Sequence, residues 1–230
     1  MRIMLLHALP LDERMWAPQV DALAGHEVVT PNLYDLGGSS MDAWATELLR
    51  QVPGEFGLVG ASMGGYCALA LARLAPERVL GLVLTGSRAD ADSPERKEGR
   101  RAAIDAVERE GAAGLWRIME PVVAGEVVPE QLRARIRELA LEQPPDGLIR
   151  AVRAIRDRPD STDVVRGLRV PFVVVTGDHD PINPVDYARS LAAEAPEGEA
   201  VVFEETGHLP SFERPEAFDA RLLDLVERLG

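Results

Sequence analysis

The feature that most constrains the fold of this chain is an alternation of short apolar runs with longer amphipathic stretches. Six runs are rich in strand-forming residues, and none alternates cleanly between polar and apolar side chains: Ile3–Leu6, His26–Thr30, Phe56–Val59, Val79–Leu84, Phe172–Thr176 and Ala200–Phe203. Such runs suit strands buried on both faces of a parallel sheet. The stretches between them predict helices, at Met41–Gln51, Met63–Leu74, Pro184–Ala195 and Pro215–Leu229. Together they predict a doubly wound α/β fold.

One long segment, residues 88–160, interrupts this alternation, because it contains helical material and no strand-like run. Ser93–Glu95 has the order of a helix start, with a capping serine, a proline and then an acid. Leu148–Arg158 is another helical stretch within it. A connection of this length without structure is implausible in a compact domain. We therefore expect roughly four short helices, forming a cap inserted after the fourth strand of a core made by residues 1–87 and 161–230.

The charge and cysteine content narrow the classes of partner. The 230 residues carry 38 acidic and 25 basic side chains, a net charge of −13. This balance argues against nucleic acid or an anionic membrane as the main partner, because both need a basic face. Cys67 is the single cysteine, so no intrachain disulfide can form, and no apolar run is long enough to span a bilayer. We expect a cytoplasmic protein that acts on a small molecule.

A serine stands at the junction of a predicted strand and a predicted helix. Phe56–Val59 runs directly into Gly60-Ala-Ser62-Met-Gly64, and a helical stretch follows. In this G-x-S-x-G pattern the serine occupies a tight, strained turn, and the flanking glycines leave room for it. The free N–H groups and the dipole of the helix favour negative charge that develops nearby. A glycine-rich turn without chemistry is the alternative, but the placement between strand and helix favours a nucleophile at Ser62.

A serine nucleophile needs a base, and the base needs an orienting acid. His208 follows the last predicted strand, so it lies at the carboxyl edge of the sheet, where ligand sites of open α/β sheets occur. Asp178 and Asp180 follow the fifth strand at the same edge, and both are candidates for the acid, although either could cap the next helix. His179 lies between them, but consecutive residues rarely converge on one ion, so we expect no metal.

The turn at Ser62 and five further segments resemble motifs of the α/β-hydrolase superfamily, and the resemblance runs nearly end to end. Besides the turn at Ser62, His7–Pro10 with Trp16 is similar to the family's oxyanion loop, and Gly207–Pro215 to its histidine loop. The other similar segments are Pro31–Ser39, Pro76–Val79 and Gly177–Pro184. The spacing Gly177-x-x-Asp180-x-x-x-Pro184 matches the family's acid motif and selects Asp180 over Asp178.

The resemblance implies a three-layer α/β-hydrolase fold. Because the chain begins where the family's third strand lies, we expect about six strands in a mainly parallel sheet. It also implies a small serine esterase or enol-lactonase with Ser62 as nucleophile, His208 as base and Asp180 as acid, using no cofactor. The backbone N–H groups of Leu9 and Met63 would form the oxyanion hole.

Several questions of substrate and chemistry stay open. Enol-lactone or carbon–carbon bond hydrolysis can use the same triad, and a cofactor-free lyase or a non-catalytic ligand receptor is less favoured. Trp16, Trp116 and Met119 are candidate substrate contacts, although apolar residues at helical spacing more often pack in a core. The motifs lead us to expect a neutral or apolar ester or lactone substrate, and the few arginines that could meet an anion lie mostly in the cap. We expect a monomer or a homodimer.

Overall fold

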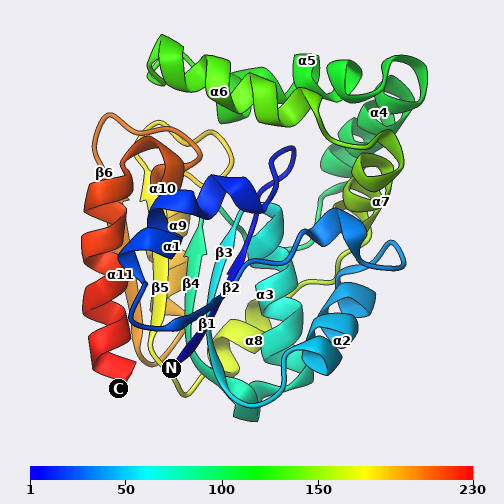
Figure 1. The fold of residues 1–230 in the computed structure, drawn as a ribbon. Helices are drawn as coiled ribbons and strands as arrows, with labels where there is room; N and C mark the ends of the chain where they lie inside the picture. Colours follow the sequence, from blue (N-terminus) through cyan, green and yellow to red (C-terminus); the bar gives the residue numbers. More distant parts are fainter. Residues whose placement is uncertain (230) are drawn as a thin grey trace.

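The computed structural model describes residues 1–229, and its sheet has six strands in the order β2-β1-β3-β4-β5-β6 (Figure 1). Every pair of neighbouring strands in this range runs parallel. The predicted α/β class and the six-stranded parallel sheet are therefore confirmed. The strands are β1 (Arg2–Leu6), β2 (Glu27–Val29), β3 (Phe56–Ala61), β4 (Val79–Thr85), β5 (Phe172–Gly177) and β6 (Gly198–Phe203).

Helices cover both faces of the sheet, which makes three layers (Figure 1). Neighbouring residues of a strand point to opposite faces, so Leu58 of β3 packs in one core cluster with Trp44, and Val59 packs in the other with Phe218. Both faces are therefore apolar, which explains why the strands show no polar alternation. One face carries α2 (Met41–Gln51), α3 (Met63–Leu74), α8 (Thr162–Gly167) and α9 (Val185–Ala193), and the other α1 (Ala17–Ala22) and α11 (Pro215–Leu229).

Between β4 and α8, four helices follow one another in the chain and lie above the carboxyl ends of the strands (Figure 1). The Ser93 side chain caps the first of them by accepting the N–H of Arg96, and Pro94 occupies its first turn, as predicted. The last of them begins at Pro145 and not at Leu148, because a first-turn proline needs no N–H acceptor. The four helices are α4 (Pro94–Glu110), α5 (Ala112–Val123), α6 (Glu130–Leu141) and α7 (Pro145–Arg156).

Short helical turns, which the hydrophobic pattern did not predict, complete the connections. Each is too short to show a helical period, so sequence alone offers little signal for it. They are the 3₁₀ turns η1 (Glu13–Trp16), η2 (Leu33–Asp35) and η3 (Pro76–Arg78), together with α10 (Pro210–Glu213). In the described part of the chain, no helix combines the length and the hydropathy that crossing a bilayer requires.

The edge strand β6 approaches α9 closely enough to require glycine. A Cβ atom at Gly198 would overlap the backbone carbonyl oxygen of Ala192, so Gly198→Ala must displace backbone. We expect this substitution to lower the free energy of unfolding by about 1–3 kcal/mol in urea denaturation. Gly167→Ala is the matched control, because no atom lies within 4 Å of its Cβ position. Equal stability of G198A and the wild type would contradict this packing.

Candidate active site

Ser62 occupies the turn between β3 and α3 in a conformation that few residues adopt. Its φ is 48° and its ψ is −109°, and its side chain caps no N–H group of the helix. Two hydrogen bonds hold the strained backbone: the Ser62 N–H donates to the carbonyl of Thr85 (2.8 Å), and the Ser87 hydroxyl donates to the carbonyl of Ser62 (2.8 Å). Strain of this kind persists only where the surroundings enforce it. The turn thereby leaves the Ser62 hydroxyl free for other contacts.

The glycines two residues before and after Ser62 permit this turn. A Cβ atom at Gly64 would overlap the backbone carbonyl of Leu6 at the end of β1. A Cβ atom at Gly60 would press on the backbone of Gly65 in the first turn of α3. Helix α3 can therefore begin directly against the sheet only if both positions lack a side chain. This contact is the physical reason for the G-x-S-x-G pattern.

The structure brings Ser62, His208 and Asp180 into one hydrogen-bonded line. The Nε2 atom of His208 lies 2.9 Å from Ser62 Oγ, and its Nδ1 atom lies 2.9 Å from Asp180 Oδ1. Both the imidazole and the carboxylate are almost fully buried. Ser62 follows β3, Asp180 follows β5 and His208 follows β6. All three strands end at the carboxyl edge of the sheet. These are the residues that the sequence selected.

Asp180 is held as an anion in spite of its burial. Burial by itself would raise the pKa of this carboxyl, but the adjacent His208 ring and two backbone N–H groups keep the pKa below its ordinary value. The N–H groups are those of Ile182 and Asn183, which donate to Asp180 Oδ1 over 2.8 and 3.1 Å. The carboxylate can therefore orient the imidazole and stabilise a positive charge on it.

Asp178, the other candidate acid, has a different contact. Its Oδ1 accepts the N–H of Thr206 over 3.1 Å, so it braces the loop that carries His208 without touching the imidazole. His179 is exposed and lies 3.9 Å from Asp178. Within residues 1–229, no three His, Cys, Asp or Glu side chains gather as a metal site would require. The geometry thus joins His208 to Asp180 and leaves Asp178 outside.

Glu213 is a supporting residue to which the sequence assigned no role. Its carboxylate accepts the N–H of Gly207 (2.7 Å) and the N–H of Leu209 (2.8 Å), the two residues that flank His208. Burial raises the pKa of this carboxyl. The two bonds fix the backbone on both sides of the imidazole. Its place in the histidine-loop motif was the only sequence signal for it.

The N–H groups of Leu9 and Met63 are available at the site. Within residues 1–229, neither donates a hydrogen bond to any acceptor in this structure. Met63 is the first residue of α3, and the Leu9 side chain lines the same cavity as Ser62 and His208. Two unused donors beside a nucleophile can stabilise an oxyanion.

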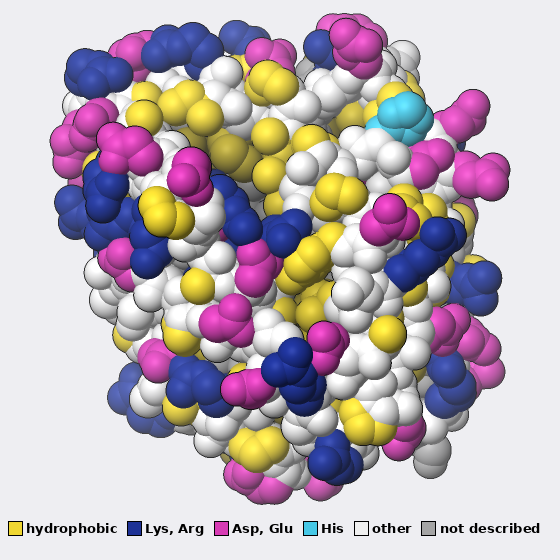
Figure 2. All heavy atoms as spheres, turned by 180° about the vertical axis from the view of Figure 1, so that it is seen from behind, with side chains coloured by type: hydrophobic (Ala, Val, Ile, Leu, Met, Phe, Trp, Pro, Cys, Tyr) yellow, Lys and Arg dark blue, Asp and Glu magenta, His cyan; other side chains and the backbone are white. Residues whose placement is uncertain are grey.

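A cavity of about 240 Å³ opens onto Ser62 and His208. Most of its lining is apolar and comes from α4, α5 and α7, including Ala103, Leu115, Ile118, Met119, Val122, Val152 and Ile155. Arg96 and Arg100 also line it. In the upper part of Figure 2 the surface is hollowed, with hydrophobic side chains inside the hollow and Lys or Arg side chains at its edge. The expectation of a neutral or apolar substrate therefore fits most of the wall but not these two arginines.

Only one of the three predicted substrate contacts, Met119, lines this cavity. Trp16 is fully buried beneath α11, with its ring 6.3 Å from that of Phe218, and Trp116 is buried in the same core cluster. Both tryptophans pack in the core and neither lines this cavity, so their contact with substrate stays a prediction. The physical reason is that the apolar face of α5 is shared between the core cluster and the cavity wall.

His7 holds the loop that presents Leu9. It is fully buried, its Nε2 atom accepts the N–H of Leu33 (2.8 Å), and its Nδ1 atom donates to the carbonyl of Ala8 (3.1 Å). Because Nε2 accepts a hydrogen bond, the ring is neutral. Burial lowers the pKa of His7 to about 4. The neutral ring thus links the loops after β1 and β2.

This lowered pKa makes stability depend on pH. Between pH 6.5 and 4 the unfolded chain binds a proton at His7 that the folded chain does not, so the free energy of unfolding falls as the pH falls. The full contribution of the shift is about 3 kcal/mol. We expect His7→Gln, whose side-chain amide oxygen can accept the same N–H, to flatten this dependence. Urea denaturation at pH 7, 6 and 5 measures how the free energy of unfolding changes with pH. An identical pH dependence in the wild type and H7Q would refute this role of His7.

Comparison with known proteins agrees with this architecture. Residues 3–221 match the model of the alpha/beta hydrolase family. A pimeloyl-[acyl-carrier protein] methyl ester esterase from Aromatoleum aromaticum is 29% identical, with 97% of each chain covered. A thermophilic esterase from Thermogutta terrifontis is 33% identical with a TM-score of 0.92, covering 100% of this chain and 90% of that one. The enol-lactonase from Burkholderia xenovorans is 26% identical with a TM-score of 0.85, covering 98% and 91%. The chain therefore belongs to the alpha/beta hydrolase family.

Proposed function

We propose that the protein is a carboxylic ester hydrolase that forms an acyl-enzyme on Ser62. The observation that carries this proposal is the buried line Asp180–His208–Ser62, with two contacts of 2.9 Å, which ends at a mostly apolar cavity. A hydroxyl bonded to a buried imidazole, itself oriented by a carboxylate, is the arrangement that acyl transfer needs. The likeness to two esterases supports the same reaction class.

The chemistry follows from the positions of the groups. As Ser62 Oγ attacks the ester carbonyl, its proton passes to Nε2 of His208, and the Asp180 carboxylate stabilises the imidazolium. The carbonyl oxygen becomes an oxyanion that accepts the N–H groups of Leu9 and Met63, each contributing about 3–4 kcal/mol. The imidazolium then protonates the departing alcohol. Water repeats the sequence on the acyl-enzyme and releases the acid, so the scheme needs no cofactor.

The helical segment 88–160 acts in this proposal as a cap on a core formed by residues 1–87 and 161–230. Helices α4, α5 and α7 supply most of the apolar wall around Ser62, and they lie over the carboxyl edge of the sheet (Figure 1). A wall of this kind binds the body of a small ester through apolar contact. The cap therefore sets the choice of substrate, and the core supplies the reacting groups.

Enol-lactone hydrolysis is a second candidate, which the structural likeness to an enol-lactonase favours. The attack of Ser62 on a lactone carbonyl uses the same groups, and the leaving oxygen stays attached to the acyl chain. A panel of linear esters of increasing acyl length, together with a lactone, separates the two candidates by kcat/KM.

Replacing the nucleophile gives the first functional prediction. We expect Ser62→Ala to fold normally and to lose at least about 10⁴-fold in kcat on a chromogenic ester. A serine-directed phosphonate followed by peptide mapping should label Ser62 in the wild type. Full activity of S62A, or labelling at another residue, would exclude this serine as the nucleophile.

The two aspartates after β5 provide a matched pair of variants. We expect Asp180→Asn to lower kcat by about 10³-fold or more, because the amide no longer stabilises the imidazolium and can select the wrong tautomer. Asp178→Asn should stay within about threefold of the wild type, since its amide oxygen can still accept the N–H of Thr206. The measurement is ester turnover by both variants under the same conditions. Equal losses would overturn the assignment of Asp180.

A further inference from the structure

Two arginines enter a cavity whose wall is otherwise almost entirely apolar. Arg96 and Arg100 stand one turn apart on α4, and both line the cavity that holds Ser62 and His208. Among residues 1–229, no aspartate or glutamate lines it. Placing guanidinium groups at an apolar surface is costly unless they meet an anion. The ester hydrolysis proposed above uses neither of them.

The arginines belong to an ion-pair network with an excess of positive charge. Asp92, whose carboxylate is completely buried, pairs with Arg100 (3.1 Å), Arg158 (2.9 Å) and, at 3.7 Å, Arg96. Asp90 pairs with Arg96 (2.6 Å) and Arg88 (2.7 Å). Four guanidinium groups therefore share two carboxylates. Asp160 lies outside the cavity lining and interacts with Asp90. Even if its carboxylate is counted with the other two, four positive groups face three negative ones.

Arg100 has hydrogen-bond donors to spare. Its Nε atom donates to Asp92 Oδ2 over 3.1 Å, while its two terminal nitrogens donate to no acceptor among the residues that the structure describes. Its side chain is 19% exposed, so these nitrogens face a partly dehydrated space. Arg96 donates from one terminal nitrogen to Asp90, while the other is buried 3.7 Å from Asp92 Oδ1 and makes no hydrogen bond within the same range. The two terminal nitrogens of a guanidinium match the two oxygens of a carboxylate.

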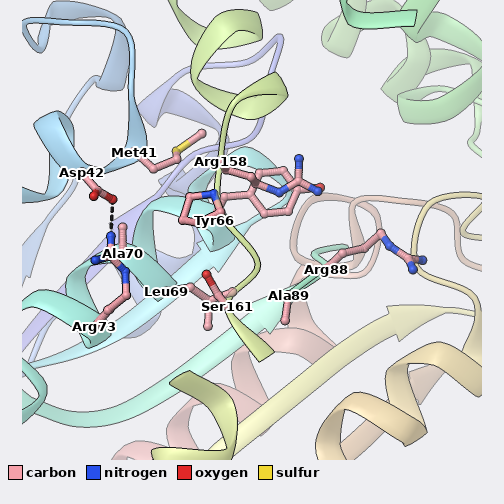
Figure 3. A pocket seen from close by; sticks show the side chains of 11 residues that line it. Met41, Asp42, Tyr66, Leu69, Ala70, Arg73, Arg88, Ala89, Arg158 and Ser161 are labelled. Atoms are coloured by element: carbon pink, nitrogen blue, oxygen red, sulfur yellow. Dashed lines mark hydrogen bonds and ion pairs between the residues drawn. The ribbon is translucent and has the colours of Figure 1, made fainter. Parts of the chain in front are cut away.

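The network behind these arginines is held in place by stacking. Figure 3 shows the guanidinium of Arg158 lying against the ring of Tyr66, with its central carbon 3.9 Å from the ring centroid. Tyr66 lines both the small pocket drawn there and the cavity at Ser62. Arg158 also pairs with Asp92, so Tyr66 and Asp92 together connect the cavity wall to the loop after α7. Arg100 is therefore anchored at its Nε atom, with its terminal nitrogens left for a ligand.

We infer that the substrate carries a carboxylate, separated from the scissile ester by an apolar segment, and that Arg100 binds this carboxylate with support from Arg96. The inference rests on the proposed ester hydrolysis and names its substrate class: half-esters of dicarboxylic acids or related molecules. The apolar wall accommodates the intervening chain, and the excess positive charge compensates the anion. Arg100 is a specificity-determining residue, which takes no part in the bond-breaking steps.

The test compares charged and neutral esters of equal length. Monomethyl esters of straight-chain dicarboxylic acids, from succinate to suberate, are each paired with the methyl ester in which a methyl group replaces the carboxylate. We expect Arg100→Gln to lower the ratio of kcat/KM for the charged ester to that for the neutral ester by about tenfold or more, because a charge-assisted bond is lost. The ratio does not depend on the fraction of folded enzyme.

Arg101→Gln is the matched control, because Arg101 is exposed on the same helix, pairs with Glu98 and does not line the cavity. Its ratio should stay within about twofold of the wild-type ratio. If R100Q does not fold, Arg100→Lys keeps the positive charge without the two-nitrogen fork, and its ratio should still fall. An unchanged ratio in the R100 variant that folds would overturn the inference.

A binding measurement separates this inference from the proposed function. Monomethyl adipate should bind the S62A protein, which cannot cleave it, about tenfold more tightly than it binds the S62A/R100Q protein in calorimetry. Equal affinities would overturn the carboxylate site whatever the turnover assays show. Absence of hydrolysis for every ester, together with a clear difference in affinity, would instead overturn the proposed hydrolysis and retain the site.

Discussion

The close contact between the start of α3 and the end of β1 is the constraint on which the rest of the site depends. Because Gly64 has no side chain, its backbone rests on the carbonyl of Leu6, and the chain can turn within one residue from β3 into α3. Ser62 must then take a positive φ, which leaves its hydroxyl outside the helix and its neighbour's N–H unused. The strain at one residue thereby places a free hydroxyl beside an unused N–H group, the two groups that the proposed mechanism uses as nucleophile and oxyanion donor.

The parallel sheet brings the other groups to this turn. Each strand ends at the same edge, so the loops after β5 and β6 deliver Asp180 and His208 beside Ser62, although 146 residues separate His208 from Ser62. Burial at this edge penalises charge, and backbone N–H groups compensate for it. Asp180 accepts two such groups, and Glu213 accepts two that flank the imidazole. The loops that carry Asp180 and Glu213 thus also supply the N–H groups that stabilise their carboxylates.

Much of the fold and of the candidate site could be predicted from local patterns in the sequence, such as apolar runs and short motifs. The apolar runs correspond to all six strands of the described chain, and Met41–Gln51 and Met63–Leu74 have the observed bounds. Ser40 caps the first of these helices, and the second begins directly after the turn at Ser62. The turn at Ser62 could be identified because the close packing of α3 against the sheet requires glycine at two positions near Ser62. Short elements such as η1 and α1 have too few residues for a period to show. The start of α7 was misplaced because a first-turn proline can either end a loop or begin a helix.

By itself the sequence determined the order of strands and helices, the strained serine and the loops from which its partners come, since backbone sterics and hydrophobic period act over a few residues. Only the tertiary structure decided which side chains face the cavity. Trp116 and Met119 lie on the same helix, yet the first packs in the core and the second lines the cavity, because neighbouring layers divide the apolar face of α5. Arg100 enters an apolar wall because buried Asp92, eight residues earlier, anchors it there. Contacts of this kind depend on the packing of distant segments, which no local pattern records.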